Sequence, residues 1–184
     1  MTTLVLPDPS LVVLIGAAGS GKSTLAGRLF APEEIVSSDA LRAVVSGDPA
    51  NQGASKVAFR ILHRTVEHRL GAGLMTVVDA TNTLARARRP LLDRARRAGV
   101  PATAIVLDLA RDRILAQNAA RTERVVDPEV IDRHLDGVRD SLRMGRLIHE
   151  GFEHVVILGT PGGAGDLTVT RRRPAPTREP AGGR

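Results

Sequence analysis

A run of residues near the start of the chain has the types and spacing that a phosphate-binding loop requires. Gly16 to Ser23 read G-x-x-x-x-G-K-S and directly follow the apolar run Leu11 to Ile15. Glycine allows the backbone to fold around phosphates, so that successive N–H groups point at the anion. A helix that begins after the loop adds the partial positive charge of its N-terminus. We therefore predict that this loop binds the triphosphate of ATP or another NTP.

Two side chains of the loop extend this prediction to phosphoryl transfer. Lys22 is placed to reach the β- and γ-phosphates, and the hydroxyl of Ser23 suits Mg²⁺, which prefers hard oxygen ligands. The residues predicted to contact the phosphate donor in this segment are Gly16, Ala18, Gly19, Ser20, Gly21, Lys22, Ser23 and Thr24.

A carboxylate and a guanidinium follow the second predicted strand. Asp39 and Arg42 are three residues apart, so in a helical turn they share one face. One interpretation is an N-cap aspartate with a local ion pair. The other is a kinase site, where the carboxylate orients an attacking hydroxyl and accepts its proton, while the arginine holds that carboxylate or a phosphate of the acceptor. The second interpretation fits kinase chemistry better.

The third predicted strand ends in a single carboxylate. Apolar residues that lead into Asp79 resemble a Walker B strand, in which the aspartate holds a metal-bound water. Asp79 is equally suited to cap the helix predicted to begin near Leu84. Both interpretations remain open at this point.

Two arginines lie in a short segment between two predicted helices. Arg121 and Arg124 are three residues apart, and Asp127 and Pro128 mark the start of the next helix. We predict a helical lid whose arginines close over the triphosphate and neutralise charge that develops during transfer. The alternative is a solvated pair of arginines.

Apolar, β-branched runs alternate with helical patterns along the chain, which is typical of an α/β doubly wound parallel sheet. The predicted strands are Leu11–Ile15, Glu34–Ser37, Met75–Asp79, Thr103–Leu107 and Val155–Leu158. The predicted helices lie near Lys22–Phe30, Ala54–Leu70, Leu84–Ala98, Arg111–Ala120 and Pro128–Leu147. Right-handed crossovers place the ends of parallel strands on one edge, where ligands bind. We therefore predict a P-loop NTPase-type sheet of five mostly parallel strands, flanked by helices and covered by a helical lid.

The composition predicts one folded domain followed by a tail. At 184 residues, of which 42% are hydrophobic, the chain is long enough for one buried core and too short for two ordinary domains. We predict a P-loop kinase domain over residues 1–164. Residues 165–184 are predicted to be a basic Pro/Gly-rich tail or linker without helix or strand.

Charge and missing residue types narrow the choice of partners. The net charge is +6, which favours a polyanion, although half of this excess lies in residues 165–184. The arginines between Arg86 and Arg97 are interpreted mainly as a solvated face that adds diffuse attraction for phosphate. The chain has no cysteine, which excludes disulfides and zinc ribbons. With no signal-peptide pattern and no long apolar segment, we expect a cytoplasmic protein without membrane contact.

The chain from about Leu4 to Leu158 resembles the 5′-kinase module of bacterial polynucleotide kinase-phosphatases, the end-healing enzymes of RNA repair. Besides the phosphate loop, the D-x-x-R pattern after the second strand and R-x-x-R in the predicted lid carry this resemblance most specifically. The other stretches that carry it are Ser37-Ser38-Asp39, Thr76 to Asn82 and Glu150-Gly151-Phe152.

The resemblance implies roles for individual residues. It implies Asp39 as the general base for the 5′-hydroxyl of RNA or DNA, Arg42 as a contact to the acceptor phosphate, and Arg121 as a contact to the donor phosphates. The chain departs from the family pattern at Gln117, where the family has an arginine. In the bacterial enzymes this module precedes a phosphatase and a ligase-like domain, and relatives suggest a homodimer.

Two other classes of function compete with polynucleotide kinase. One is a small-molecule P-loop kinase, such as a gluconate- or antibiotic-type phosphotransferase, and the other is a non-catalytic nucleotide switch. The only aromatic residues are Phe30, Phe59 and Phe152, so a base-stacking platform of the usual kind is scarcely possible, and Phe59 is expected in the core. Recognition of nucleic acid is then expected to depend on the sugar, the terminal phosphates and charge.

Overall fold

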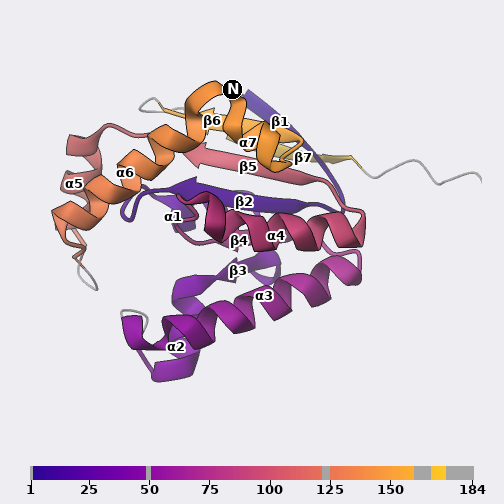
Figure 1. Ribbon diagram of the computed structural model, residues 1–184, viewed down its shortest axis with the longest axis horizontal. Coiled ribbons are helices and arrows are strands. Elements are labelled where there is room, and N and C mark those ends of the chain that lie inside the picture. Colours follow the sequence, from indigo (N-terminus) through magenta and orange to yellow (C-terminus); the bar gives the residue numbers. More distant parts are fainter. Residues whose placement is uncertain (1, 49–50, 122–124, 160–166, 173–184) are drawn as a thin grey trace, which may run out of the picture.

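A five-stranded parallel sheet forms the centre of the computed structural model, which describes residues 2–48, 51–121, 125–159 and 167–172 (Figure 1). The strand order is β3-β4-β2-β5-β6, and every neighbouring pair is parallel. The five strands are β2 Leu11–Gly16, β3 Ile35–Ser37, β4 Thr76–Asp79, β5 Ala102–Leu107 and β6 His154–Leu158. The predicted fold class and all five predicted strands are therefore confirmed, with ends that shift by a residue or so.

In the part of the chain that the structure describes, seven α-helices connect and cover these strands. They are α1 Lys22–Leu29, α2 Ser38–Ser46, α3 Ser55–Gly71, α4 Ala85–Ala98, α5 Arg111–Ala119, α6 Pro128–Leu142 and α7 Arg146–Glu150. None of these described helices has the combination of length and apolar content that a membrane span requires.

The alternation of side chains along the central strand β2 builds a core on each face of the sheet. Val13 and Ile15 pack with apolar residues of α3, α4, α6 and α7. Val12 and Leu14 face the other way and pack against α1. All six residues of β2 are buried, which explains why its sequence is a continuous apolar run. The result is a layered fold with helices on both faces of the sheet (Figure 1).

A separate two-stranded sheet closes the α1 side of the molecule. Its strands are β1 Thr2–Pro7 and β7 Leu167–Arg172, which pair in parallel. Leu6 and Leu167 are buried in the core cluster that contains α1. The prediction that residues 165–184 contain no strand is therefore wrong for 167–172: Leu167 and Val169 alternate ahead of the prolines of the tail and pack one side of β7 against the core.

The last long helix of the prediction is interrupted. A short 3₁₀ segment, Arg143–Gly145, separates α6 from α7 because Met144 adopts a left-handed conformation with φ +49°. Gly145 follows with φ +68° and serves as the N-cap of α7. The predicted helix over 128–147 is therefore two helices, and the bend returns the chain to the edge of the sheet at β6.

The attachment of β7 generates a prediction about acid stability. Arg171 donates two hydrogen bonds to the carboxylate of Glu34, at 2.6 and 2.7 Å. Burial opposes ionisation of Glu34, but hydrogen bonds from Arg171 and from the Ala31 N–H outweigh it, so the pKa of Glu34 lies below its ordinary value of 4.5. The unfolded chain then binds more protons than the folded one, so this stabilisation is present above about pH 4.5 and is lost as the pH falls through the folded-state pKa.

We expect Glu34→Gln to reduce the fall in unfolding free energy between neutral and acidic pH, because glutamine does not titrate. The measurement is a pair of urea unfolding curves for each variant, one near pH 7 and one near pH 4. Glu33→Gln is the matched control, since it removes an exposed carboxylate one residue away. Equal pH dependence in Glu34→Gln and the unmodified chain would contradict the assignment.

Candidate active site

The loop between β2 and α1 has the backbone conformation that cradles phosphates. Gly19 and Gly21 adopt φ values of +85° and +88°, which L side chains rarely tolerate. A Cβ atom at Gly16 would lie 2.7 Å from the Ser20 Oγ, so the loop folds tightly on itself. Helix α1 begins at Lys22, directly after Gly21. The predicted strand, loop and helix arrangement of the motif is therefore present.

Lys22 lies inside this loop. Its ammonium group donates hydrogen bonds to the carbonyl oxygens of Gly16 and Ala17, at 3.0 and 2.7 Å. Burial lowers the pKa of Lys22 to about 8, while the nearby carboxylates of Asp79 and Asp39 oppose the decrease. A buried ammonium that is held only by carbonyl oxygens is well suited to gain a stronger partner from a phosphate oxygen.

Ser23 and Asp79 lie against each other at the end of β4. The Ser23 hydroxyl donates a hydrogen bond of 2.7 Å to the Asp79 carboxylate. Burial raises the pKa of Asp79, although the Ser23 hydrogen bond and the charge of Lys22 oppose the increase. A hydroxyl oxygen and a carboxylate oxygen at one point of the cleft fit Mg²⁺, which binds to one or two protein oxygens together with substrate phosphates. The local arrangement therefore favours the Walker B interpretation of Asp79 over the helix cap.

Backbone contacts fix the ends of β2 and β4 to each other. The Gly16 N–H donates to the Thr81 carbonyl at 3.0 Å. The Asn82 amide donates to the Leu14 carbonyl at 2.9 Å, and Asn82 itself adopts a left-handed conformation with φ +47°. These bonds continue the contact beyond the regular pairing of the two strands, which ends at Val13 and Val78. The phosphate loop and Asp79 are thereby held in one rigid unit.

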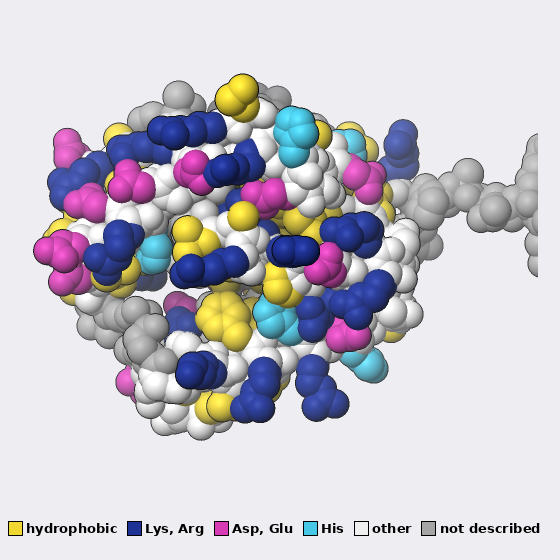
Figure 2. Space-filling model, in the orientation of Figure 1, with side chains coloured by type: hydrophobic (Ala, Val, Ile, Leu, Met, Phe, Trp, Pro, Cys, Tyr) yellow, Lys and Arg dark blue, Asp and Glu magenta, His cyan; other side chains and the backbone are white. Residues whose placement is uncertain are grey.

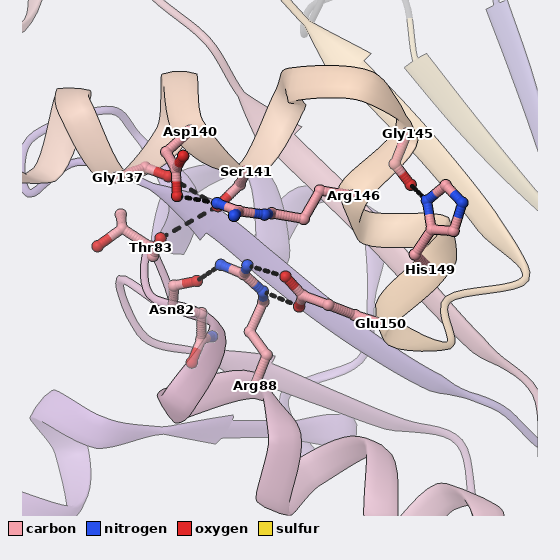
Figure 3. A network of polar contacts seen from close by, with 10 residues as sticks. All are labelled: Asn82, Thr83, Arg88, Gly137, Asp140, Ser141, Gly145, Arg146, His149 and Glu150. Atoms are coloured by element: carbon pink, nitrogen blue, oxygen red, sulfur yellow. Dashed lines mark hydrogen bonds and ion pairs between the residues drawn. The ribbon is translucent and has the colours of Figure 1, made fainter.

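A buried ion pair supports the segment after β4 from behind (Figure 3). Arg88 on α4 is 1% exposed and donates two hydrogen bonds to Glu150 on α7, at 2.8 and 2.6 Å. It also donates to the Asn82 carbonyl at 2.7 Å. Ser141 on α6 donates to the neighbouring Thr83 carbonyl at 3.1 Å. The interpretation of the α4 arginines as a solvated face is therefore wrong for Arg88, because this side chain points inward and positions the loop.

Asp39 and Arg42 face the phosphate loop across a cleft of about 310 Å³. Both lie on α2, which Ser37 caps by accepting a hydrogen bond from the Ala40 N–H. They form an ion pair, in which the Arg42 side chain is 7% exposed and the Asp39 side chain is 56% exposed. The arginine is thus a buried anchor, and the carboxylate stands open to the cleft.

The helices α5 and α6 form a lid beside the loop. Asn118 donates to the Val126 carbonyl at 2.7 Å and accepts from the Val126 N–H at 2.9 Å, so it fastens the two ends of the segment that contains Arg121. Val126 and Ile131 pack against Ala17 of the phosphate loop. Arg121 lines the cleft, whereas the predicted donor contact Arg124 lies outside the described residues.

The lid also touches the loop through a side chain that sequence reasoning did not select. His134 on α6 lines the cleft, and the Ala18 N–H lies 3.4 Å from its Nδ1 atom. Neither His134 nor the buried Asn118 belongs to a recognisable motif, and both could be found only from the packing of α5 and α6 against the loop. Gly16 and Ser20, for which we predict contacts to the donor, are buried and do not line the cleft. The remaining predicted residues that line the cleft are Ala18, Gly19, Gly21, Lys22, Ser23, Thr24, Asp39, Arg42, Asp79 and Arg121.

A family model described as an AAA domain matches residues 11–144, more than half of the chain, and these residues include the loop and the cleft. The chain belongs to this AAA domain family. No match to a curated protein reaches significance.

Solved structures share the fold of this AAA domain at low sequence identity. It is similar to a chain of the Pnkp1/Rnl/Hen1 RNA repair complex at 22% identity and a TM-score of 0.63, over 73% of this chain and 45% of that chain. The similarity to a gluconokinase from Sinorhizobium meliloti 1021 has 18% identity and a TM-score of 0.54, over 84% and 86% of the two chains. The PezAT toxin-antitoxin system of Streptococcus pneumoniae gives 16% identity and a TM-score of 0.63, over 83% and 67%. The AAA domain therefore shares its fold with these proteins.

We expect Glu150→Gln to lower the unfolding free energy of the AAA domain by about 3 kcal/mol, because it leaves the buried Arg88 charge without its counterion. The measurement is urea unfolding at neutral pH. Asp140→Asn is the control, since Asp140 pairs with Arg146 on the surface of the same region and its loss should cost less than about 1 kcal/mol (Figure 3). The double variant Arg88→Met/Glu150→Gln should recover part of the loss, and a Glu150→Gln effect no larger than that of the control would contradict the assignment.

Proposed function

We propose that the protein transfers the γ-phosphate of ATP or another NTP to the 5′-hydroxyl end of RNA or DNA, as in nucleic-acid end healing. The observation that carries this proposal is the position of Asp39, which lines the same cleft as Lys22 and Ser23 but comes from a different element. A carboxylate opposite a phosphate cradle is what a kinase requires and what a simple nucleotide switch does not.

The side chains of the cleft divide the reaction between them. The acceptor oxygen forms a bond to the γ-phosphorus, the bond from that phosphorus to the β-phosphate oxygen breaks, and the acceptor proton passes to Asp39. Arg42 fixes the carboxylate through its ion pair and adds positive charge where the acceptor enters. Lys22 and Arg121 supply positive charge on the donor side.

Ser23 and Asp79 would hold the magnesium ion that kinases of this fold use. When bound, Mg²⁺ neutralises part of the charge on the phosphate oxygens. The protein residues themselves orient the triphosphate: the loop amides and Lys22 bind it, and the Asn118 clasp holds Arg121 beside it.

Two lines support a polynucleotide over a small acceptor. The D-x-x-R pattern, which carries the resemblance to polynucleotide kinase-phosphatases, lies in the cleft as Asp39 and Arg42. The fold is also similar to a chain of an RNA repair complex. A small-molecule kinase remains the second candidate, since the gluconokinase shares the fold over most of both chains.

A panel of acceptors separates the two candidates. Labelled NTP and Mg²⁺ are offered with a 5′-hydroxyl oligonucleotide, a free nucleoside, gluconate and a set of sugars. We expect label to appear on the oligonucleotide and not on the sugars. Labelling of a sugar alone would contradict the proposal and support the small-molecule kinase.

We expect Asp39→Asn to lower kcat by about a hundredfold or more, because general-base catalysis contributes that much, while the Kd for NTP changes by less than about threefold. Turnover is measured on the oligonucleotide, and NTP binding is measured separately by calorimetry. Asp136→Asn is the control, since Asp136 is an exposed carboxylate of α6 outside the cleft. Unchanged turnover in Asp39→Asn would show that another group accepts the proton.

A further inference from the structure

Helices α3 and α4 together have a larger net positive charge than the whole chain. Helix α3 contains four Lys and Arg residues and one carboxylate, and α4 contains six arginines and one carboxylate. Their net charge is therefore +8, whereas the chain as a whole has +6. The two helices pack side by side, joined by Arg94, which donates to the His63 carbonyl at 3.0 Å and pairs with Glu67 at 3.5 Å. Such a concentration of one sign costs self-repulsion, so it requires a reason.

Half of these cations are exposed and take no part in the internal bonding of the described structure. The solvent-exposed members without a hydrogen bond or ion pair within the described residues are Lys56, Arg60, Arg64, Arg86 and Arg89, which we call the α3–α4 basic face. Their charged end groups form no ion pair within the described residues, so they are available to bind an external anion. Figure 2 shows Lys and Arg side chains along both helices, with hydrophobic and His side chains and a few Asp and Glu side chains between them.

The spacing of the cations on α3 forms a row. Lys56, Arg60 and Arg64 recur every four residues, so successive charges lie about 6 Å apart along the helix axis. A point anion contacts one member of such a row, whereas a chain with a phosphate on every unit contacts all of them. The row therefore fits a linear polyanion.

The basic face is continuous with the cleft. Ser55 and Phe59, in the first turns of α3, line the cleft together with Asp39 and Arg42. Lys56 and Arg60 are their immediate neighbours on the outer side of the helix. On α4, Arg86 and Arg89 belong to the first turns, at the edge of the sheet where the cleft lies. A strand whose end reached Asp39 would thus pass directly onto these cations.

We infer that the α3–α4 basic face binds the sugar-phosphate backbone of the acceptor polynucleotide, downstream of the 5′ end that occupies the cleft. This inference rests on the proposed function and adds to it a second subsite that acts through phosphate charge, without base readout. Phe59 belongs to the cleft and not to this face, and the rest of its ring packs against the core. Binding is therefore sequence-independent and sensitive to salt.

The test compares a dinucleotide acceptor, which ends within the cleft, with a long 5′-hydroxyl oligonucleotide. For Lys56→Gln/Arg60→Gln/Arg64→Gln we expect the KM of the long acceptor to rise about tenfold at low salt, while the KM of the dinucleotide changes by less than about twofold. The slope of log KM against log salt for the long acceptor should fall by about two, since three phosphate contacts at about 0.7 each are lost. Arg86→Gln/Arg89→Gln should give a smaller change of the same kind.

Arg133→Gln/Arg139→Gln/Arg143→Gln is the matched control, because it removes the same charge from exposed positions of α6 and the segment after it. Equal length dependence and equal salt slopes in the α3 variant, the control and the unmodified protein would overturn the inference and leave the proposed function intact.

A binding measurement separates the other outcomes. Fluorescence anisotropy of a labelled oligonucleotide is recorded without NTP, next to binding of phosphatidylserine vesicles. If no polynucleotide is phosphorylated, the proposed function fails. The anisotropy measurement then tests the inference about the basic face by itself. Weaker oligonucleotide binding by the α3 variant would support the inference, and equal binding would overturn it. Binding of the vesicles without binding of the oligonucleotide would assign the face to a membrane surface and overturn the inference.

Discussion

The joint between the ends of β2 and β4 is the constraint on which the rest of the site depends. Two hydrogen bonds hold these ends together where regular strand pairing stops. The Gly16 N–H donates to the Thr81 carbonyl, and the side-chain amide of Asn82 donates to the Leu14 carbonyl. The phosphate loop leaves from one end, and Asp79 stands at the other. Because both are tied to one unit, the Ser23 to Asp79 contact needs no movement of the backbone to form. Arg88 on α4 binds both Glu150 on α7 and the Asn82 carbonyl, so these two helices are connected to the same unit.

The two sides of the cleft differ in how their shape is determined. The donor side is a tight loop with left-handed glycines and a buried lysine, and its shape is determined by its own backbone. The other side is helix α2, on which the carboxylate of Asp39 is mostly exposed and is paired with the buried Arg42. In the proposed reaction, this combination of a tight phosphate loop and an open carboxylate suits an acceptor that enters end-on and extends beyond the protein.

The sequence was sufficient wherever a single segment determines its own structure. The phosphate loop, the strand before it and the helix after it follow from the spacing of Gly16, Gly21 and Lys22, and the start of α6 follows from Asp127 and Pro128. The prediction that residues after the strands gather at one edge is likewise confirmed for Asp39 and Asp79, because parallel topology requires it.

What the sequence could not supply depends on partners that are distant in the chain. Strand β7 pairs with β1, which lies at the other end of the sequence, and the prolines that follow β7 and its arginines indicate an unstructured tail. Arg88 looks like any other arginine of a basic helix until Glu150, 62 residues later, is seen beside it. Asn118 likewise has no distinguishing neighbour in the sequence, and its role depends on its hydrogen bonds with Val126, eight residues later.

The pairing of β1 with β7 also has a consequence for the order of folding. Thr3 and Thr168, which face each other across this small sheet, are separated by 165 positions, so closing that loop carries one of the largest entropic costs in the chain. The five central strands and their crossover helices involve shorter closures and do not need the small sheet for their own pairing. On this loop-closure argument, we expect the two-stranded sheet to assemble after the five central strands.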